Sequence, residues 1–142
     1  MTHIAVKDVM TTDLISVHEN DIVSAAAKIF NERNFHHIPV VSDKGALSGI
    51  ISLTDIDRIK TGASLFKNPN KEEYDAAIFE TMWVRDLMTR SVVHLQPEDS
   101  IYNAYEIFKE NHFRALPVVK ENELVGMVTP IDILTYFFQK QN

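Results

Sequence analysis

The sequence Gly49-Ile-Ile-Ser-Leu-Thr-Asp55 returns later in the chain as Gly126-Met-Val-Thr-Pro-Ile-Asp132. In both copies an apolar run leads to a hydroxyl residue, and an acid follows three positions later. This order is typical of a strand that hands over to a helix whose first free N–H groups are capped. The second copy also has Pro130 at the first helical position, where a missing N–H costs nothing. Each stretch therefore predicts the end of a strand and the start of a helix.

The repetition extends upstream from these stretches. Val6-Lys-Asp-Val-Met-Thr11 returns as Val84-Arg-Asp-Leu-Met-Thr89, a shift of 78 positions, and Pro39-Val-Val41 returns at the same shift as Pro117-Val-Val119. Agreement in order and spacing over some fifty residues indicates a duplicated structural unit. Two units of this size are too few for a stacked solenoid, and each alone has a marginal core. We expect one compact body built from two pseudo-symmetric halves.

Each repeat has the pattern β-α-β-β-α, which places the chain in the α/β (α+β) class. Helices are predicted where apolar residues recur at helical spacing, as at Val23, Ala26, Ala27 and Phe30. A proline inside a predicted strand, Pro39 or Pro117, indicates an edge position or a strand start. The expected strands are 14–17, 37–41 and 47–52, then 92–95, 116–119 and 124–129; the expected helices begin at 23 and after 52, then span 101–111 and 131–138. We divide the chain into a first repeat (1–61), a connecting loop and helix (62–83) and a second repeat (84–142).

Composition excludes several classes of function. A net charge of −6 disfavours general binding to nucleic acid, which depends on neutralising phosphates. No apolar run reaches the roughly eighteen residues that span a bilayer, and no signal peptide opens the chain, so we expect a cytoplasmic protein without membrane contact. Adjacent His36 and His37 point to opposite faces of a strand, and there is no cysteine, so we expect no metal site. No catalytic constellation is present, and we expect no enzyme activity.

Two interpretations of the hydroxyl-x-x-acid pattern stand together. In the structural one, Ser52 and Thr129 only cap helices. In the functional one, a helix start attracts anions, the hydroxyl donates to a phosphate, and the acid accepts the hydroxyl groups of a ribose. Capping would fix Ser52 and Thr129 while Asp55 and Asp132 point into a cleft.

The chain resembles a tandem pair of cystathionine-β-synthase (CBS) domains, also called a Bateman module. The resemblance runs from Val6 to about Phe138 and rests on three motifs in order, each present twice: the Met-Thr opening, the Ile/Leu-Pro-Val-Val strand and the Gly-to-Asp ending. It implies two repeats packed about a pseudo-twofold axis. Between them it implies two clefts that in many relatives bind AMP, ADP, ATP or S-adenosylmethionine.

The resemblance also implies roles for individual residues. Asp55 and Asp132 match the family's ribose-binding aspartates, and Ser52 and Thr129, with Thr54, match hydroxyls near the ribose and phosphate. Phosphate would meet Arg114 in one repeat and His36 in the other. Adenine would be held by backbone and apolar groups around Ile15, Val17, Ile38, Val93 and Leu116.

These residues predict two unequal sites and a sensor function. Arg114 is permanently charged and forks onto phosphate, whereas His36 is mostly neutral near pH 7, so the Arg114 site should favour a polyphosphate. No cofactor is expected to be required, and Mg²⁺ would enter only with ATP. The leading hypothesis is a stand-alone regulatory module that signals to an effector protein. The alternative is a ligand-free structural or oligomerisation module docked on an enzyme or transporter.

The end of the chain raises the question of self-association. Leu134, Tyr136, Phe137 and Phe138 form an apolar tail. It would either make a homodimer contact or cap the protein's own core, and the sequence leaves both open.

Overall fold

The computed structural model describes residues 3–64, 71–111 and 113–140. These form two compact units. The first-repeat unit comprises Ile15–Ser91, and the second-repeat unit joins Met1–Leu14 to Val92–Asn142. The compact units therefore differ from the sequence repeats in one respect: the opening segment of each repeat lies in the unit built mainly from the other repeat.

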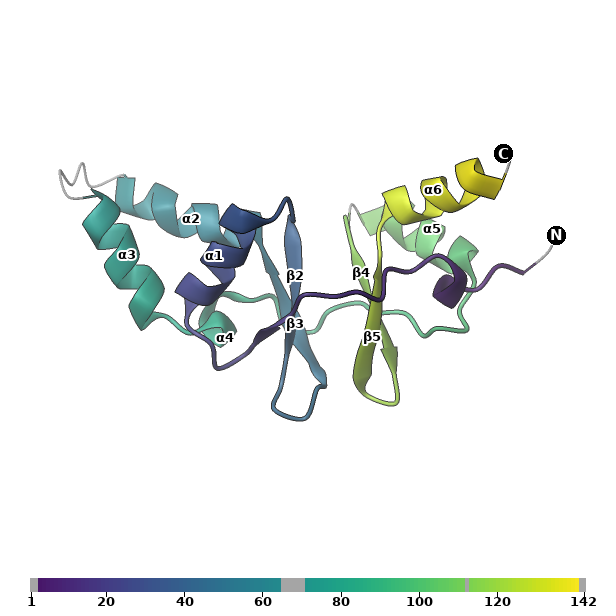
Figure 1. Ribbon diagram of the computed structural model, residues 1–142, viewed down its shortest axis with the longest axis horizontal. Coiled ribbons are helices and arrows are strands. Elements are labelled where there is room, and N and C mark those ends of the chain that lie inside the picture. Colours follow the sequence, from purple (N-terminus) through teal and green to yellow (C-terminus); the bar gives the residue numbers. More distant parts are fainter. Residues whose placement is uncertain (1–2, 65–70, 112, 141–142) are drawn as a thin grey trace. The chain divides into compact units, whose positions relative to one another are not determined.

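The described part of the first-repeat unit contains a three-stranded sheet and four helices, whose arrangement is drawn in Figure 1. In chain order these elements are β1 (Val17–His18), α1 (Val23–Glu32), β2 (His37–Val41), β3 (Leu47–Ser52), α2 (Leu53–Ser64), α3 (Lys71–Thr81) and α4 (Val84–Leu87). The predicted strands 37–41 and 47–52 are confirmed at both ends. The predicted strand 14–17 is wrong in extent, because only Val17 and His18 pair with β2.

Strand β2 lies in the middle of this sheet, antiparallel to β3 and parallel to β1. Its residue type predicted that Pro39 would lie on an edge strand or at a strand start. This prediction is wrong, because Pro39 is the third residue of the central strand. The main-chain carbonyl of Val41 accepts a hydrogen bond from the Glu19 N–H, and residues two apart in a strand face the same side. The Pro39 nitrogen therefore faces the β1 side, one residue before Val40, where the pairing with Val17 begins. The missing N–H falls where β1 has not yet started.

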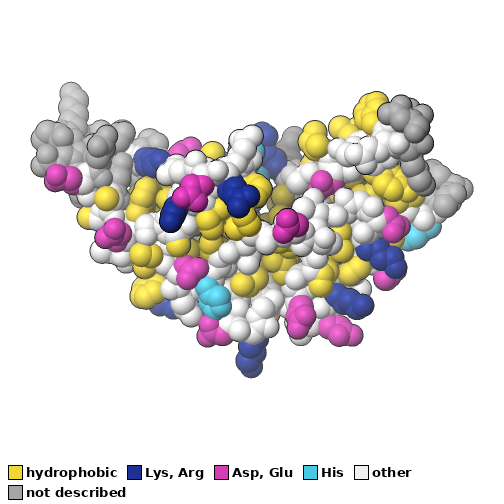
Figure 2. Space-filling model, viewed as in Figure 1, with side chains coloured by type: hydrophobic (Ala, Val, Ile, Leu, Met, Phe, Trp, Pro, Cys, Tyr) yellow, Lys and Arg dark blue, Asp and Glu magenta, His cyan; other side chains and the backbone are white. Residues whose placement is uncertain are grey.

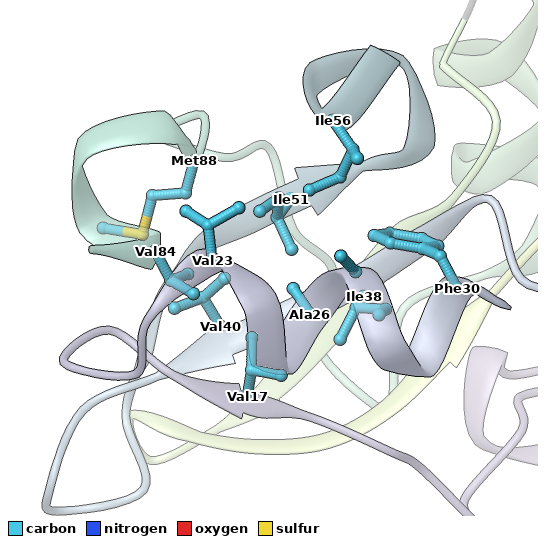
Figure 3. Close-up of a cluster of buried hydrophobic side chains, with 11 residues drawn as sticks. Val17, Val23, Ala26, Phe30, Ile38, Val40, Ile51, Ile56, Val84 and Met88 are labelled. Atoms are coloured by element: carbon cyan, nitrogen blue, oxygen red, sulfur yellow. The ribbon is translucent and has the colours of Figure 1, made fainter. Parts of the chain in front are cut away.

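The core of this unit lies between the sheet and α1, α2 and α4 (Figure 3). The four apolar positions that predicted α1 are all buried, which confirms the helical spacing. Ile38, Ile51 and Ile56 are at most 1% exposed. Burial of each such side chain contributes about 1.5–3 kcal/mol. The other members of the cluster are Val17, Val40, Val84 and Met88.

Helix α3 confirms the predicted helix between the repeats, and it packs against both α1 and α2. Phe79 and the following Met82 pack against the core, and the ammonium group of Lys60 on α2 lies 5.9 Å from the ring centroid of Phe79. The outer side of α1 is thereby covered by part of the same chain.

The second-repeat unit repeats the plan with fewer elements. They are η1 (Val6–Asp8), α5 (Ile101–Asn111), β4 (Leu116–Lys120), β5 (Glu123–Val128) and α6 (Pro130–Lys140). Strands β4 and β5 are antiparallel, and the predicted strand 92–95 is reduced to one bridge between Leu95 and Val118. Its core is formed by Val6, Leu95, Ile101, Ala104, Leu116, Val118 and Val128.

The two opening segments make matching contacts. Thr89 exchanges two main-chain hydrogen bonds with Ile50 of β3, and Thr11 exchanges two with Met127 of β5. A Cβ atom added to Gly49 would lie 2.5 Å from the carbonyl oxygen of Thr89. The segment can approach β3 this closely only because position 49 has no side chain.

Candidate functional site

The hydroxyl-x-x-acid pattern forms a reciprocal capping box in both units. The Ser52 N–H donates to Asp55 Oδ2 at 2.9 Å, and the Asp55 N–H donates to Ser52 Oγ at 3.1 Å. At the start of α6 the Thr129 N–H donates to Asp132 Oδ2 at 2.9 Å, and the Asp132 N–H donates to Thr129 Oγ1 at 3.1 Å. The predicted capping bonds are thus present in both units. We call the two sites the first corner and the second corner.

Capping uses only one oxygen of each carboxylate. The other, Oδ1, has a different partner in each corner. Asp55 Oδ1 lies 3.5 Å from Nη1 of Arg58, whose side chain is 70% exposed. Asp132 Oδ1 accepts a hydrogen bond from the Thr11 hydroxyl at 3.3 Å. Asp55 is buried, at 6% exposure, whereas Asp132 is partly exposed.

Sequence reasoning missed Arg58 and Thr11 as partners of these acids. Arg58 lies three residues after Asp55, a spacing that brings side chains together on a helix, so its contact was open to prediction. Thr11 belongs to the repeated Met-Thr opening, which pointed to a shared role. Its contact with an acid 121 positions away depends on the exchange of opening segments between the units.

The hydroxyl residues of the two corners differ at one position. Thr54 is exposed at the second position of α2. The matching residue of α6, 77 positions later, is Ile131, which has no hydroxyl. A contact made by Thr54 therefore has no counterpart in the second corner.

The two candidate phosphate ligands are exposed side chains that precede strands. His36 comes before β2, and its main-chain carbonyl accepts a hydrogen bond from the Leu53 N–H at 2.9 Å, which holds it beside the start of α2. Arg114 precedes β4 by two residues. The bond found at His36 is impossible at Arg114, because the residue matching Leu53 is Pro130, which has no N–H.

The candidate adenine contacts divide into buried and exposed residues. Ile38 and Leu116 are 0% and 1% exposed, and Val17 is also a core residue. A ligand could meet only their backbone groups. Ile15 is partly exposed and Val93 is 43% exposed, so these two present apolar surface.

The described residues lack both a metal-binding cluster and a membrane-spanning helix. Across residues 3–64, 71–111 and 113–140, no three His, Asp or Glu side chains are placed to hold a metal ion. No helix within those ranges is long and apolar enough to cross a membrane.

The sequence comparisons agree with the internal duplication. The model of the CBS domain family matches residues 6–61 and again residues 84–139. A homoserine O-acetyltransferase of Methanococcoides burtonii is 31% identical over 134 residues, which are 94% of this chain but 24% of that enzyme. Hypoxic response protein 1 of Mycobacterium tuberculosis is 28% identical over 127 residues, 89% of this chain and 80% of that protein. The chain thus spans about a quarter of the homoserine O-acetyltransferase that it matches.

Solved structures match over nearly the whole chain. CBSX2, a CBS-pair protein of Arabidopsis thaliana, has a TM-score of 0.80 and 27% identity, and the match covers 99% of each chain. A crystal structure of CBSX2 in complex with AMP gives a TM-score of 0.77 at 26% identity, covering 97% of this chain and 98% of that one. The CBS domain pair of protein MJ0100, in complex with 5′-methylthioadenosine and S-adenosyl-L-methionine, gives 0.75 at 27% identity, covering 98% and 99%.

Proposed function

Because this chain belongs to the CBS domain family, we propose that it is a regulatory module that binds an adenosine-containing ligand at its two corners and signals to an effector protein. The observation that carries the proposal is the capping box found in both units, in which the Oδ1 atom of each carboxylate takes no part. We infer no catalytic role, and the homoserine O-acetyltransferase activity is not transferred, because that match covers only 24% of the enzyme.

The corners offer the groups that a ribose and its phosphate need. A carboxylate accepts the hydroxyl protons of a ribose, and Oδ1 of Asp55 or Asp132 is the oxygen that capping does not use. The hydroxyls of Ser52 and Thr129 accept a backbone N–H within the box, which leaves their own O–H to donate. The start of the helix favours negative charge nearby.

The ligands of two similar structures support the adenosine part of the proposal. CBSX2 was crystallised with AMP, and the MJ0100 domain pair with 5′-methylthioadenosine and S-adenosyl-L-methionine. These molecules share adenosine and differ in what is attached to it. We therefore propose that the corners bind the adenosine part of the ligand and that Arg114 and His36 bind the group attached to it.

We propose that the two corners bind with unequal strength. A ribose hydroxyl at Asp132 would replace the Thr11 hydroxyl, an exchange of like for like, whereas at Asp55 it would displace a guanidinium. Arg114 also gives the second-repeat unit a permanent positive charge with forked donors, which the imidazole of His36 does not offer. The second corner should bind phosphorylated ligands more tightly. Mg²⁺ would accompany ATP only.

The alternative is a structural module that binds no ligand. It is favoured by the fact that each acid already has a capping partner and a second contact. In that case the carboxylates would contribute only to stability, by about 1 kcal/mol each.

Calorimetric titration of ligand-free protein with AMP, ATP and S-adenosylmethionine separates these functions. Asp→Asn keeps an oxygen for the cap but turns a donor toward the ligand, so Asp132→Asn should weaken AMP binding in its corner by about tenfold to a hundredfold. Asp55→Asn should have the same kind of effect in the other corner. Asp57 is an exposed residue of α2, the helix that also holds Asp55. The Asp57→Asn variant is the control and should bind AMP like wild type. Flat titrations with all three ligands would overturn the proposal in favour of the structural module.

A further inference from the structure

The start of α4 pairs with the segment that precedes α1 through main-chain hydrogen bonds. Ile22 and Trp83 form an antiparallel bridge, and the N–H of Arg85 donates to the carbonyl of Glu19 at 3.0 Å. The side chains of Ile22 and Trp83 are 37% and 41% exposed. The guanidinium carbon of Arg85 lies 5.1 Å from the centroid of the Trp83 ring, and Arg85 Nη1 donates to Asn20 Oδ1 at 2.6 Å. We call Asn20, Ile22, Trp83 and Arg85 the tryptophan–arginine patch.

The second-repeat unit has the same main-chain arrangement with different side chains. At positions shifted by 78, Ala5 and Ser100 form the bridge, and the N–H of Lys7 donates to the carbonyl of Pro97 at 3.0 Å. Ala5 is buried, and the ammonium group of Lys7 forms an ion pair with Glu98, the residue that matches Asn20, at 3.1 Å. The same backbone pairing therefore forms with small side chains and balanced charge. The fold does not require an exposed tryptophan or an arginine at these positions.

Within the described part of the chain, Arg85 pairs with no acid. None of the ion pairs there includes it, and its side-chain partner is the neutral amide of Asn20. Two acids nearby in the sequence bind backbone: Asp86 Oδ2 and Asp21 Oδ2 each accept a main-chain N–H, at 3.3 and 2.9 Å. A guanidinium carries several N–H donors, so those not used by Asn20 remain for an anion.

Arg90 adds a second positive charge next to the patch. Its Nη2 donates to the main-chain carbonyl of Arg85 at 3.0 Å, whereas the matching residue of the other repeat is the uncharged Thr12. The chain as a whole has a net charge of −6, and Figure 2 shows Asp and Glu side chains spread over the visible face of both units. The patch thus combines positive charge and apolar surface on an acidic protein.

We propose that the effector protein docks on the tryptophan–arginine patch through an acidic segment, in which a carboxylate binds Arg85 and a neighbouring apolar side chain packs on Trp83 and Ile22. The partner is the effector of the regulatory function proposed above, on which this proposal rests. A carboxylate accepts two parallel N–H bonds from a guanidinium, and stacking on the indole ring holds the guanidinium plane in place. Tryptophan and arginine are also the residue types that most often dominate the binding energy of protein interfaces.

The patch and the first corner are connected by a short stretch of backbone. Helix α4 begins directly after Trp83, and the chain then reaches Thr89, which exchanges two main-chain hydrogen bonds with Ile50. Ile50 lies on β3, two residues before Ser52. A segment bound to the patch would therefore contact the element that is bonded to the strand leading into the first corner.

The fluorescence of Trp83 tests the docking surface directly, because Trp83 is the only tryptophan of the chain. The probe is a synthetic peptide of alternating glutamate and leucine, titrated at low salt into the ligand-free full chain. Binding should bury the indole and move its emission maximum to shorter wavelength, and added salt should weaken it by screening the charges. Arg85→Gln should weaken peptide binding by about tenfold, because it removes the charge and the forked donors.

Lys7→Gln changes the matching position of the second-repeat unit and is the control, which should bind the peptide like wild type. A peptide with glutamine in place of glutamate should leave the emission maximum unchanged at the same concentrations. A constant emission maximum with the glutamate peptide would overturn the proposal, because the patch would then bind no acidic segment. An equal response to both peptides would also overturn it, because charge would then play no part.

Calorimetry with AMP on the same samples separates the docking surface from the proposed adenosine ligand. Arg85→Gln should bind AMP like wild type, because Arg85 belongs to neither capping box. Wild-type protein that binds AMP but not the glutamate peptide would overturn the docking surface alone. Wild-type protein that binds the peptide but not AMP would overturn the adenosine ligand and support the docking surface.

Discussion

The two repeat units share what their fold requires and differ in what their surfaces present. Both bury the valine that opens the repeat, Val6 or Val84, at 0% exposure. Both use a capping box to start the closing helix. In contrast, Ser24 and Ala27 of α1 line a groove against α3, whereas the residues at the matching positions of α5 are the exposed Tyr102 and Tyr105. Both units keep the residues that hold the strand-to-helix corner, whereas the matching outer positions of α1 and α5 differ.

The same contrast applies inside the corners. The caps are geometrically alike, with matching distances of 2.9 and 3.1 Å. The oxygen left over meets Arg58 in one unit and Thr11 in the other. Experiments on paired residues can therefore separate what the fold needs from what a ligand would use.

The largest expected difference concerns the paired glycines. In Gly49→Ala the new methyl group would meet the Thr89 carbonyl oxygen at 2.5 Å, and backbone cannot easily move away. In Gly126→Ala its nearest neighbour, at 2.6 Å, is the sulfur of the flexible Met10 side chain. We expect Gly49→Ala to lower the free energy of unfolding by about 2–3 kcal/mol and Gly126→Ala by about 1 kcal/mol. Urea unfolding followed by circular dichroism measures both.

Gly45→Ala serves as a control of a different kind, because Gly45 has a φ of 78° and nothing within 4 Å of an added Cβ. Its cost would come from backbone conformation alone. Equal losses for Gly49→Ala and Gly126→Ala would contradict the expectation that the closest contact, with backbone at Gly49 and with a flexible side chain at Gly126, decides the loss of stability.

A smaller difference is expected between Arg114 and His36. If Arg114 binds phosphate, Arg114→Gln should weaken AMP binding by about tenfold and leave 5′-methylthioadenosine, which has no phosphate, unchanged. His36→Gln should weaken AMP binding by about twofold at most, because an imidazole lacks the permanent charge and the forked donors of a guanidinium. Calorimetry with the two ligands measures both effects. Equal losses for AMP and methylthioadenosine in Arg114→Gln would show that Arg114 acts on the fold and not on phosphate.

The smallest expected effect is the titration of Tyr102. Its hydrogen bond to Glu106, together with the negative charge of that carboxylate, raises the pKa of Tyr102 above the ordinary 10.0. A raised pKa means that the folded protein favours the protonated phenol. Any resulting stabilisation is therefore complete below pH 10 and is lost as the pH rises through the folded-state pKa.

Glu106→Gln should lower the pKa of Tyr102 toward its ordinary value. Glu110→Gln is the control and should leave the pKa of Tyr102 as it is in wild type. The chemical shift of the labelled Tyr102 ring carbon against pH gives the pKa directly.

The sequence predicted the elements that carry their own local signal. Apolar spacing fixed α1 and α5, and the hydroxyl-x-x-acid pattern located both corners to the residue. The strands at 14–17 and 92–95 were overestimated, because apolar residues there extend beyond the few positions that pair with a neighbour.

The contacts that the sequence did not predict depend on packing between residues far apart in the chain. The exchange of opening segments joins Thr11 to Asp132, and nothing in the local pattern of either residue indicates it. The apolar tail was left open between a dimer contact and a cap on the core. The exposure of Leu134, Phe137 and Phe138 shows that these side chains are not buried in the core of their unit.

Native mass spectrometry of ligand-stripped protein mixed with AMP tests the central proposal most directly, because it counts bound molecules per chain. We predict up to two AMP per chain in wild type, with the second molecule appearing at higher concentration than the first. In Asp132→Asn the tighter of the two binding events should weaken by about tenfold to a hundredfold, while the other stays unchanged. Wild-type protein that shows only its ligand-free mass at saturating AMP would contradict the proposal that the corners bind adenosine.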